Sequence, residues 1–152
     1  MNLSQHELPD ELESLAREVE ARIPFNRVLG VHLDELTKET SRISFEMRED
    51  LVGNFQRGTL HGGVISSVLD VTGGMAALVA GAGDPESGLK ERFGVLGTID
   101  LRVDYLRPGT GQRFEATGTI LRGGRKVAVT RMELRNDAAD LIAVGTGTYI
   151  VG

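Results

Sequence analysis

The second half of the chain alternates apolar and polar residues in the pattern of half-buried strands. Between Thr98 and Tyr105 every second residue is apolar, and charged or hydroxyl residues fill the other positions. The same period of two predicts strands over residues 98–105, 113–121, 126–135 and 141–151. Gly123 and Gly124 separate the second from the third and predict a two-residue hairpin. These four strands are therefore expected to form an antiparallel meander.

The first half begins with helical periodicity. Pro9 and Asp10 open a predicted helix over residues 9–22, in which acidic residues crowd the first turn and apolar residues recur at helical spacing. Further elements are predicted in this order: a turn over 24–29, strands over 31–36 and 42–48, a long apolar helix over 62–81 and a loop over 83–92. A helix followed by consecutive strands implies an α+β domain with the helix on one face of the sheet. Because the helix is apolar over much of its circumference, the sheet must curl around it or a second subunit must cover it.

Composition narrows the classes of protein. A chain of 152 residues with a net charge of −5 fits one domain and argues against general nucleic-acid binding. Seventeen lysines and arginines still allow local anion binding. Without cysteine and with three histidines the chain is poorly supplied for a metal site, so we expect no metal or cofactor. The acidic, amphipathic N-terminus is not a signal peptide, and we expect a cytoplasmic protein.

Residues 63–82 are long and apolar enough to suggest a membrane span. Asp70 lies in the middle, where a charge costs about 2.5–3.5 kcal/mol on insertion scales. Glycines interrupt the segment and no basic cluster flanks it. We therefore expect a buried core helix and no membrane partner.

Asp70 is the residue of this helix that most needs an explanation. It stands in a stripe whose other members are small: Gly63, Ser66, Gly74, Ala77 and Gly81. Close approach of another element explains the small residues but not the carboxylate, which is costly among apolar residues unless it is paired or used. A carboxylate in an apolar cleft is a natural general base. The alternative is a buried salt bridge with Arg102 or Arg107.

The start of the helix is a candidate oxyanion site. Gly62 and Gly63 follow His61, and two glycines at a helix N-terminus leave backbone N–H groups uncovered. Gly62 and Asp70 are eight residues apart, or about 12 Å along a helix, too far to serve one carbonyl group together. The site should therefore combine Gly62 of one subunit with Asp70 of its two-fold mate, which makes a homodimer the minimal unit.

The motifs together resemble the hotdog-fold thioesterases of the phenylacetate-degradation type. They are Asn54 seven residues before His61, LHGGVISSVLDV at 60–71, GTIDLRVDYLRPG at 97–109 and the ending GTYIVG. The full run is most similar to a bacterial branch of medium- to long-chain acyl-CoA thioesterases. The resemblance implies a long central helix wrapped by a curved antiparallel sheet over residues 25–152, with residues 1–24 as a helical extension.

The resemblance also assigns roles to individual residues. Gly62 would donate its N–H to the thioester oxygen with help from Asn54, and Asp70 would activate water or attack directly. Thr98 would help to hold the water. His61 would either shape the entrance of the helix or cap it. The segment from Asn54 to His61 is one residue longer than in better-known relatives.

The implied partner is an acyl-CoA substrate, whose phosphates need basic groups near the mouth of the site. Arg107, Arg122, Arg125 and Lys126 are the candidates, although a charged hairpin is also commonly just solvated. The resemblance further implies a homotetramer of two dimers. A hotdog dehydratase would need a histidine–carboxylate dyad in another segment, for which no histidine is available except His61, which lies at the helix entrance. The remaining alternative is a non-catalytic protein that binds or senses acyl-CoA.

Overall fold

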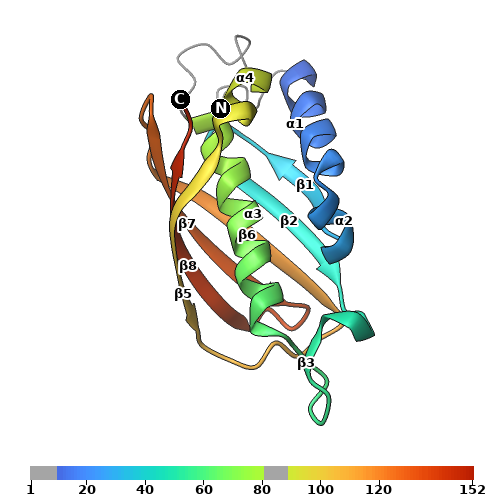
Figure 1. Ribbon diagram of the computed structural model, residues 1–152. Helices are drawn as coiled ribbons and strands as arrows, with labels where there is room; N and C mark the ends of the chain where they lie inside the picture. Colours follow the sequence, from blue (N-terminus) through green and yellow to red (C-terminus); the bar gives the residue numbers. More distant parts are fainter. Residues whose placement is uncertain (1–9, 81–88) are drawn as a thin grey trace, which may run out of the picture.

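The strands of this protein curve around one long helix (Figure 1). The computed structural model describes residues 10–80 and 89–152. The elements are α1 (Asp10–Arg22), α2 (Pro24–Leu29), β1 (His32–Leu36), β2 (Thr40–Glu46), a 3-10 turn (Glu49–Leu51), β3 (Val52–Asn54), β4 (Thr59–Leu60), α3 (Gly62–Ala80), α4 (Leu89–Val95), β5 (Gly97–Tyr105), β6 (Arg113–Arg122), β7 (Val127–Asn136) and β8 (Leu141–Ile150). The predicted α+β class, with a hotdog-type central helix, is confirmed.

The main sheet has six antiparallel strands in the order β1-β2-β6-β7-β8-β5. The predicted meander is correct for β6, β7 and β8 and wrong for β5, which lies at the edge beside β8. The reason is that β6 already has a neighbour on each side, β2 and β7. A short hairpin of β3 and β4, which the sequence pattern did not predict, precedes α3.

Helix α3 lies on the inner face of the sheet and supplies much of the core. Its apolar residues Ile65, Val68, Leu69, Met75 and Leu78 are all buried. By length and composition α3 is the one helix among the described residues that is apolar enough to cross a membrane. Packing against the sheet identifies it instead as the expected core helix of the domain.

The small residues of α3 allow the sheet to come close. A Cβ atom on Gly73 would lie 2.4 Å from the Tyr149 hydroxyl and 2.7 Å from Thr130 Oγ1. At Gly74 the nearest contact would be an ordinary 3.6 Å. The tight approach is therefore at Gly73, which lies next to the predicted stripe, while Gly81 lies outside the described residues.

Two sequence predictions need correction. The expected loop over 83–92 contains the start of α4, because Phe93 and the following Leu96 pack against the core; its residues up to 88 lie outside the described part of the chain. The link between β6 and β7 spans residues 123–126 and is not a two-residue hairpin. Neither glycine in it has a positive φ. Gly123 is needed because a Cβ atom there would lie 2.9 Å from the Ala80 carbonyl oxygen.

The other predicted elements agree with the structure to within two residues at the ends that can be compared. The predicted helix over 9–22 corresponds to α1, with residue 9 outside the described residues. The predicted turn over 24–29 is the short helix α2, which begins at a proline and ends at Gly30 with a φ of 70°.

Candidate functional site

Asp70 and Thr98 meet on the inner side of the sheet. Thr98 Oγ1 donates a hydrogen bond of 2.8 Å to Asp70 Oδ1. Strict alternation along β5 would turn Thr98 outwards, because Leu101 and Val103 face the core. A β-bulge changes the direction: Thr98 pairs with Tyr149 and Asp100 with Thr148, so one extra residue is accommodated between them. Thr98 therefore shares the inner face with Tyr149 and reaches the carboxylate.

Tyr149, on β8, contacts the backbone of Asp70. Its hydroxyl donates to the backbone carbonyl of Asp70 at 3.1 Å, and its side chain is 1% exposed. Burial, followed by the nearby charge of Asp70, raises the pKa of the Tyr149 phenol above its usual value, so it stays a neutral donor. The sequence pattern did not single out Tyr149. The available signal was its inward position on β8, where the other inward residues nearby, Gly145 and Gly147, are small.

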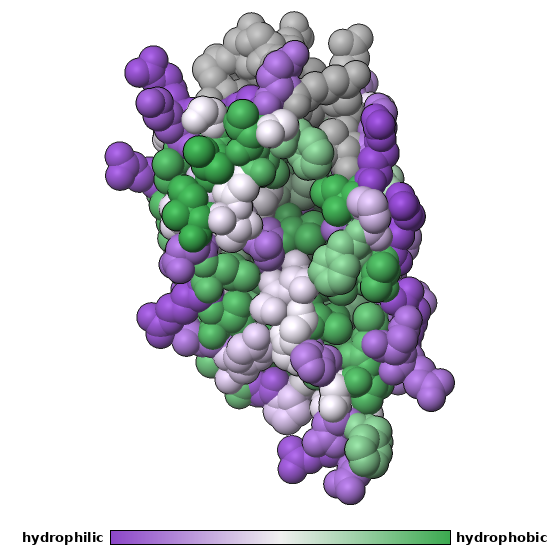
Figure 2. All heavy atoms as spheres, in the orientation of Figure 1, coloured by the Kyte–Doolittle hydropathy of each residue, from purple (hydrophilic) through white to green (hydrophobic). Residues whose placement is uncertain are grey.

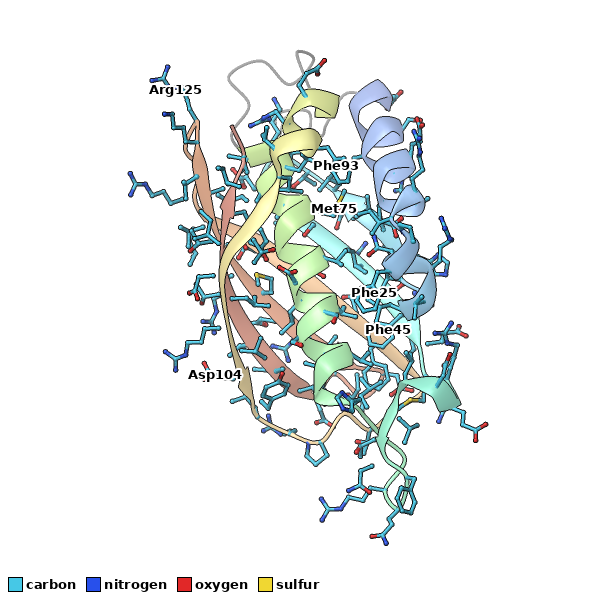
Figure 3. The ribbon with its side chains drawn as sticks, in the orientation of Figure 1. Phe25, Phe45, Met75, Phe93, Asp104 and Arg125 are labelled. Atoms are coloured by element: carbon cyan, nitrogen blue, oxygen red, sulfur yellow. The ribbon has the colours of Figure 1, made fainter. Side chains whose placement is uncertain are left out.

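An open cavity of about 260 Å³ begins at this pair of residues. Most of the lining is apolar and comes from α2, α3, α4 and the residues around them: Ile23, Phe25, Val71, Gly74, Met75, Phe93, Leu96 and Gly97; the polar lining residues are Asn26, Asp70, Thr98 and Tyr149. Figure 2 shows a hollow with hydrophobic residues gathered around it, and Figure 3 shows Phe25, Met75 and Phe93 between α3 and its neighbouring helices. The cavity can hold an apolar group with one end against the Asp70 carboxylate.

The salt-bridge alternative for Asp70 finds no support in the described part of the chain. Arg102 pairs with Asp104 at 3.1 Å, and Arg107 Nη1 donates to the Leu141 carbonyl at 3.0 Å. Among the ion pairs of residues 10–80 and 89–152, none involves Asp70. The carboxylate is half-buried and keeps Thr98 as its side-chain donor.

Within the described part of the chain, the N-terminus of α3 leaves the Gly62 N–H without an acceptor. His61 Nδ1 accepts the Gly63 N–H at 2.8 Å, and the His61 carbonyl accepts the Val64 N–H at 3.0 Å. The Gly62 N–H donates to no group among the described residues. The Tyr105 hydroxyl donates to the Gly62 carbonyl at 3.1 Å, which holds the end of β5 against this turn. His61 is thus a capping residue here, and Gly62 offers a free donor.

Asn54 lies in the β3–β4 hairpin that precedes the helix. Its Oδ1 accepts the backbone N–H groups of Gln56 at 3.1 Å and Arg57 at 3.2 Å. This arrangement closes a turn of the Asx type. In the single chain the side-chain oxygen of Asn54 is therefore engaged locally and is not brought to Asp70.

The predicted basic residues fall into two separate groups. Arg107 lines a hollow of about 390 Å³ together with Gly62 and Tyr105. Arg122, Arg125 and Lys126 line another hollow, of about 680 Å³, at the β6–β7 hairpin. That hairpin contacts Ala80, ten residues beyond Asp70 on α3, or about 15 Å along the helix.

Within the described residues no three His, Cys, Asp or Glu side chains are grouped so as to hold a metal ion. The chemistry available to these residues is that of a carboxylate, a hydroxyl and a helix N-terminus. Along the unbroken α3, Gly62 and Asp70 are separated by about 12 Å.

Comparison with known proteins relates this chain to thioesterases. Residues 57–143 match the model of the thioesterase superfamily. The medium/long-chain acyl-CoA thioesterase YigI of Escherichia coli (strain K12) is 48% identical over 134 residues, 86% of each chain. A crystal structure from Shewanella oneidensis, described as related to the thioesterase superfamily, is 42% identical, with a TM-score of 0.84 over 93% of this chain and 95% of that one. The E. coli PaaI protein from the phenylacetic acid degradation operon, at 17% identity, shares the fold, with a TM-score of 0.77 over 93% and 94% of the two chains.

Proposed function

Because the chain belongs to the thioesterase superfamily, we propose that it hydrolyses acyl-CoA thioesters to a free acid and CoA. The observation that carries the proposal is the Asp70 carboxylate, oriented by Thr98 at one end of a largely apolar cavity. The similarity to YigI supports CoA as the carrier and medium- to long-chain acyl groups as substrates.

In the proposed reaction Asp70 accepts a proton from water, and the water oxygen attacks the thioester carbonyl carbon. Negative charge then develops on the carbonyl oxygen, where a free backbone N–H stabilises it. The C–S bond breaks as this charge returns, and the CoA sulfur leaves as the thiolate and takes up the proton that Asp70 accepted from water. Direct attack by the carboxylate, followed by hydrolysis of the anhydride, uses the same residues.

The oxyanion donor in this proposal is Gly62 of a second subunit. Strand β5 has nine residues and an unpaired edge, along which Ile99 and Tyr105 are more than half exposed. Such an edge favours pairing with another chain. The strand runs along α3 from Thr98 beside Asp70 to Tyr105 beside Gly62. Two-fold pairing of β5 centred near Leu101 and Arg102 would place Thr98 opposite the partner's Tyr105, and so Asp70 near Gly62 of the partner subunit.

Arg122, Arg125 and Lys126 form one basic hollow that suits the CoA phosphates, and Arg107 forms part of another beside Gly62. A contribution of Asn54 to the oxyanion site would require its side chain to leave the turn. The homotetramer, a cytoplasmic location and the division into a 1–24 extension and a 25–152 domain stay predictions.

The proposal is tested by measuring CoA release from acyl-CoA esters of short, medium, long and aromatic acyl groups. Wild type should turn over one class, and Asp70→Ala should be slower by about two orders of magnitude or more. Asp34→Ala, which removes an exposed carboxylate from β1, is the control and should keep wild-type activity. Tight binding of these esters by wild type without CoA release would contradict catalysis and favour a sensor.

A further inference from the structure

Asn26, which lines the cavity that contains Asp70, carries one of the buried polar atoms that have no hydrogen-bond partner among the described residues. Asn26 on α2 is 2% exposed. Its Nδ2 donates to the backbone carbonyl of Glu20 at 3.0 Å, whereas its Oδ1 has no hydrogen-bond partner in the part of the chain that the structure describes. Since a carbonyl can only accept, the Glu20 oxygen fixes which end of the amide carries the nitrogen. The unpaired atom of Asn26 is therefore an acceptor.

The nitrogen and the oxygen of the Asn26 amide differ in what they bind. Nδ2 links α2 to the end of α1, which is a structural role. Oδ1 accepts no hydrogen bond from the described residues, and a buried acceptor left unpaired destabilises a protein. Asn26 is one of the few polar residues in a cavity whose other walls are mostly apolar side chains such as Phe25 and Met75. The missing partner is thus expected on the molecule that enters the cavity.

The chemistry of Oδ1 restricts this molecule. An acceptor in an apolar cavity favours a ligand with a neutral hydrogen-bond donor and disfavours a carboxylate or phosphate, which offers only acceptors. In the proposed reaction the group that enters the apolar cavity is the acyl chain. On an acyl chain the simplest neutral donor is a hydroxyl group.

Resting on the proposed function, we infer that Asn26 is a specificity residue whose Oδ1 accepts a hydrogen bond from a hydroxyl group on the acyl chain. The enzyme then hydrolyses hydroxyacyl thioesters faster than the unsubstituted thioesters of the same length. The reason is that a plain chain leaves Oδ1 unpaired, and sites built to bind a hydroxyl discriminate strongly against analogues without it.

The test compares kcat/KM for decanoyl-CoA with its β-hydroxy, mid-chain hydroxy and ω-hydroxy derivatives. For at least one position of the hydroxyl, wild type should prefer the hydroxylated ester by about tenfold or more. Asn26→Leu replaces the amide by an apolar side chain of similar shape. It should bring the preference close to one, mainly by lowering kcat/KM for the hydroxylated ester.

A control separates recognition from the link between the helices. Arg27 Nη1 also donates from α2 to α1, to the Ala21 carbonyl at 3.4 Å, but its exposed side chain does not line the cavity. Arg27→Met should therefore keep the wild-type preference. An equal loss of activity towards both esters in Asn26→Leu would assign Asn26 a structural role only and overturn the inference.

The wild-type comparison keeps the inference testable even if Asn26→Leu does not fold. Equal kcat/KM for plain and hydroxylated esters at every position would overturn it while leaving the proposed hydrolysis intact. Failure of wild type to release CoA from any of these or the other acyl-CoA esters would instead contradict the proposed function.

Discussion

At the level of single residues, the Thr98 hydroxyl orients the Asp70 carboxylate through a hydrogen bond to Oδ1. Thr98 reaches the carboxylate only because the β5 bulge turns its side chain to the inner face. A hydrogen bond to a charged group contributes about 1.5–3 kcal/mol. In the proposed reaction the same hydroxyl also keeps one carboxylate oxygen occupied, so that the other is directed at water.

Thr98→Val should therefore reduce kcat for acyl-CoA hydrolysis by about ten- to a hundredfold while the fold is retained. The isosteric change removes the donor but keeps the shape and the β-branch that suits a strand. Thr98→Ser keeps the hydroxyl and should retain most of the activity. Steady-state rates and thermal unfolding of both variants check this, and wild-type kcat in Thr98→Val would contradict the role of the hydrogen bond.

The sequence identified Asp70 because a lone carboxylate in an apolar helix is conspicuous, but it could not identify its supports. In the sequence Tyr149 resembles an ordinary core residue of a strand. Only the register of β8 brings its hydroxyl to the backbone carbonyl of Asp70. Asn26 carries no signal in the sequence, since its importance comes from one unpaired atom. Thr98 was assigned from the family resemblance, because simple alternation would have turned it away.

At the level of elements, helix α1 packs on the domain with the carboxylate of Glu20 buried. Glu20 is 7% exposed, and burial raises its pKa, against the opposing effects of the His32 charge, a hydrogen bond from the Leu33 backbone and the Arg17 charge. A carboxyl group with a raised pKa in the folded state stabilises the protein fully below its unfolded pKa, about 4.3. That contribution is lost as the pH rises through the folded value.

Glu20→Gln should accordingly match wild type in stability near pH 4 and become the more stable protein as the pH rises towards 7. Urea unfolding at a series of pH values measures the difference between the two proteins. Glu18→Gln on the same helix is the control, since Glu18 is exposed and among the described residues pairs only with Arg22, and it should show little change. A difference for Glu20→Gln that does not vary with pH would show that burial does not govern this group.

Periodicity predicted most elements because it reports directly which face is buried. The predicted bounds of strands β6, β7 and β8 and of helix α3 agree with the structure to within one residue at the ends that can be compared. It could not show that β5 lies beside β8, since alternation says nothing about which strand is the neighbour. The Gly123-Gly124 pair predicted a two-residue hairpin, but the link is longer and the structure uses Gly123 for close approach to Ala80.

At the scale of the whole molecule, the two edges of the sheet differ. β1 is short, carries Asp34 and Glu35 and packs beside α1. β5 is longer and leaves apolar side chains such as Ile99 exposed at its free edge. Charged, short edges resist pairing and long apolar ones favour it. The molecule is thus suited to pair through β5, and that pairing would complete the site.

In the proposed dimer Asp70 of one subunit acts with the Gly62 N–H of another, and mixed dimers distinguish this arrangement from a site within one subunit. Gly62→Pro removes that N–H at a helix position where proline is tolerated, and a Cβ atom there meets Tyr105 only at an ordinary 3.5 Å. Gly62→Ala, which keeps the N–H, is the control and should stay active.

Gly62→Pro and Asp70→Asn should each be inactive alone, and refolding them together in equal amounts should restore acyl-CoA hydrolysis. Half of the dimers would then be mixed, each with one intact site of two, so about a quarter of the wild-type CoA release is expected. Activity no higher than the sum of the two separate variants would contradict a site shared between subunits.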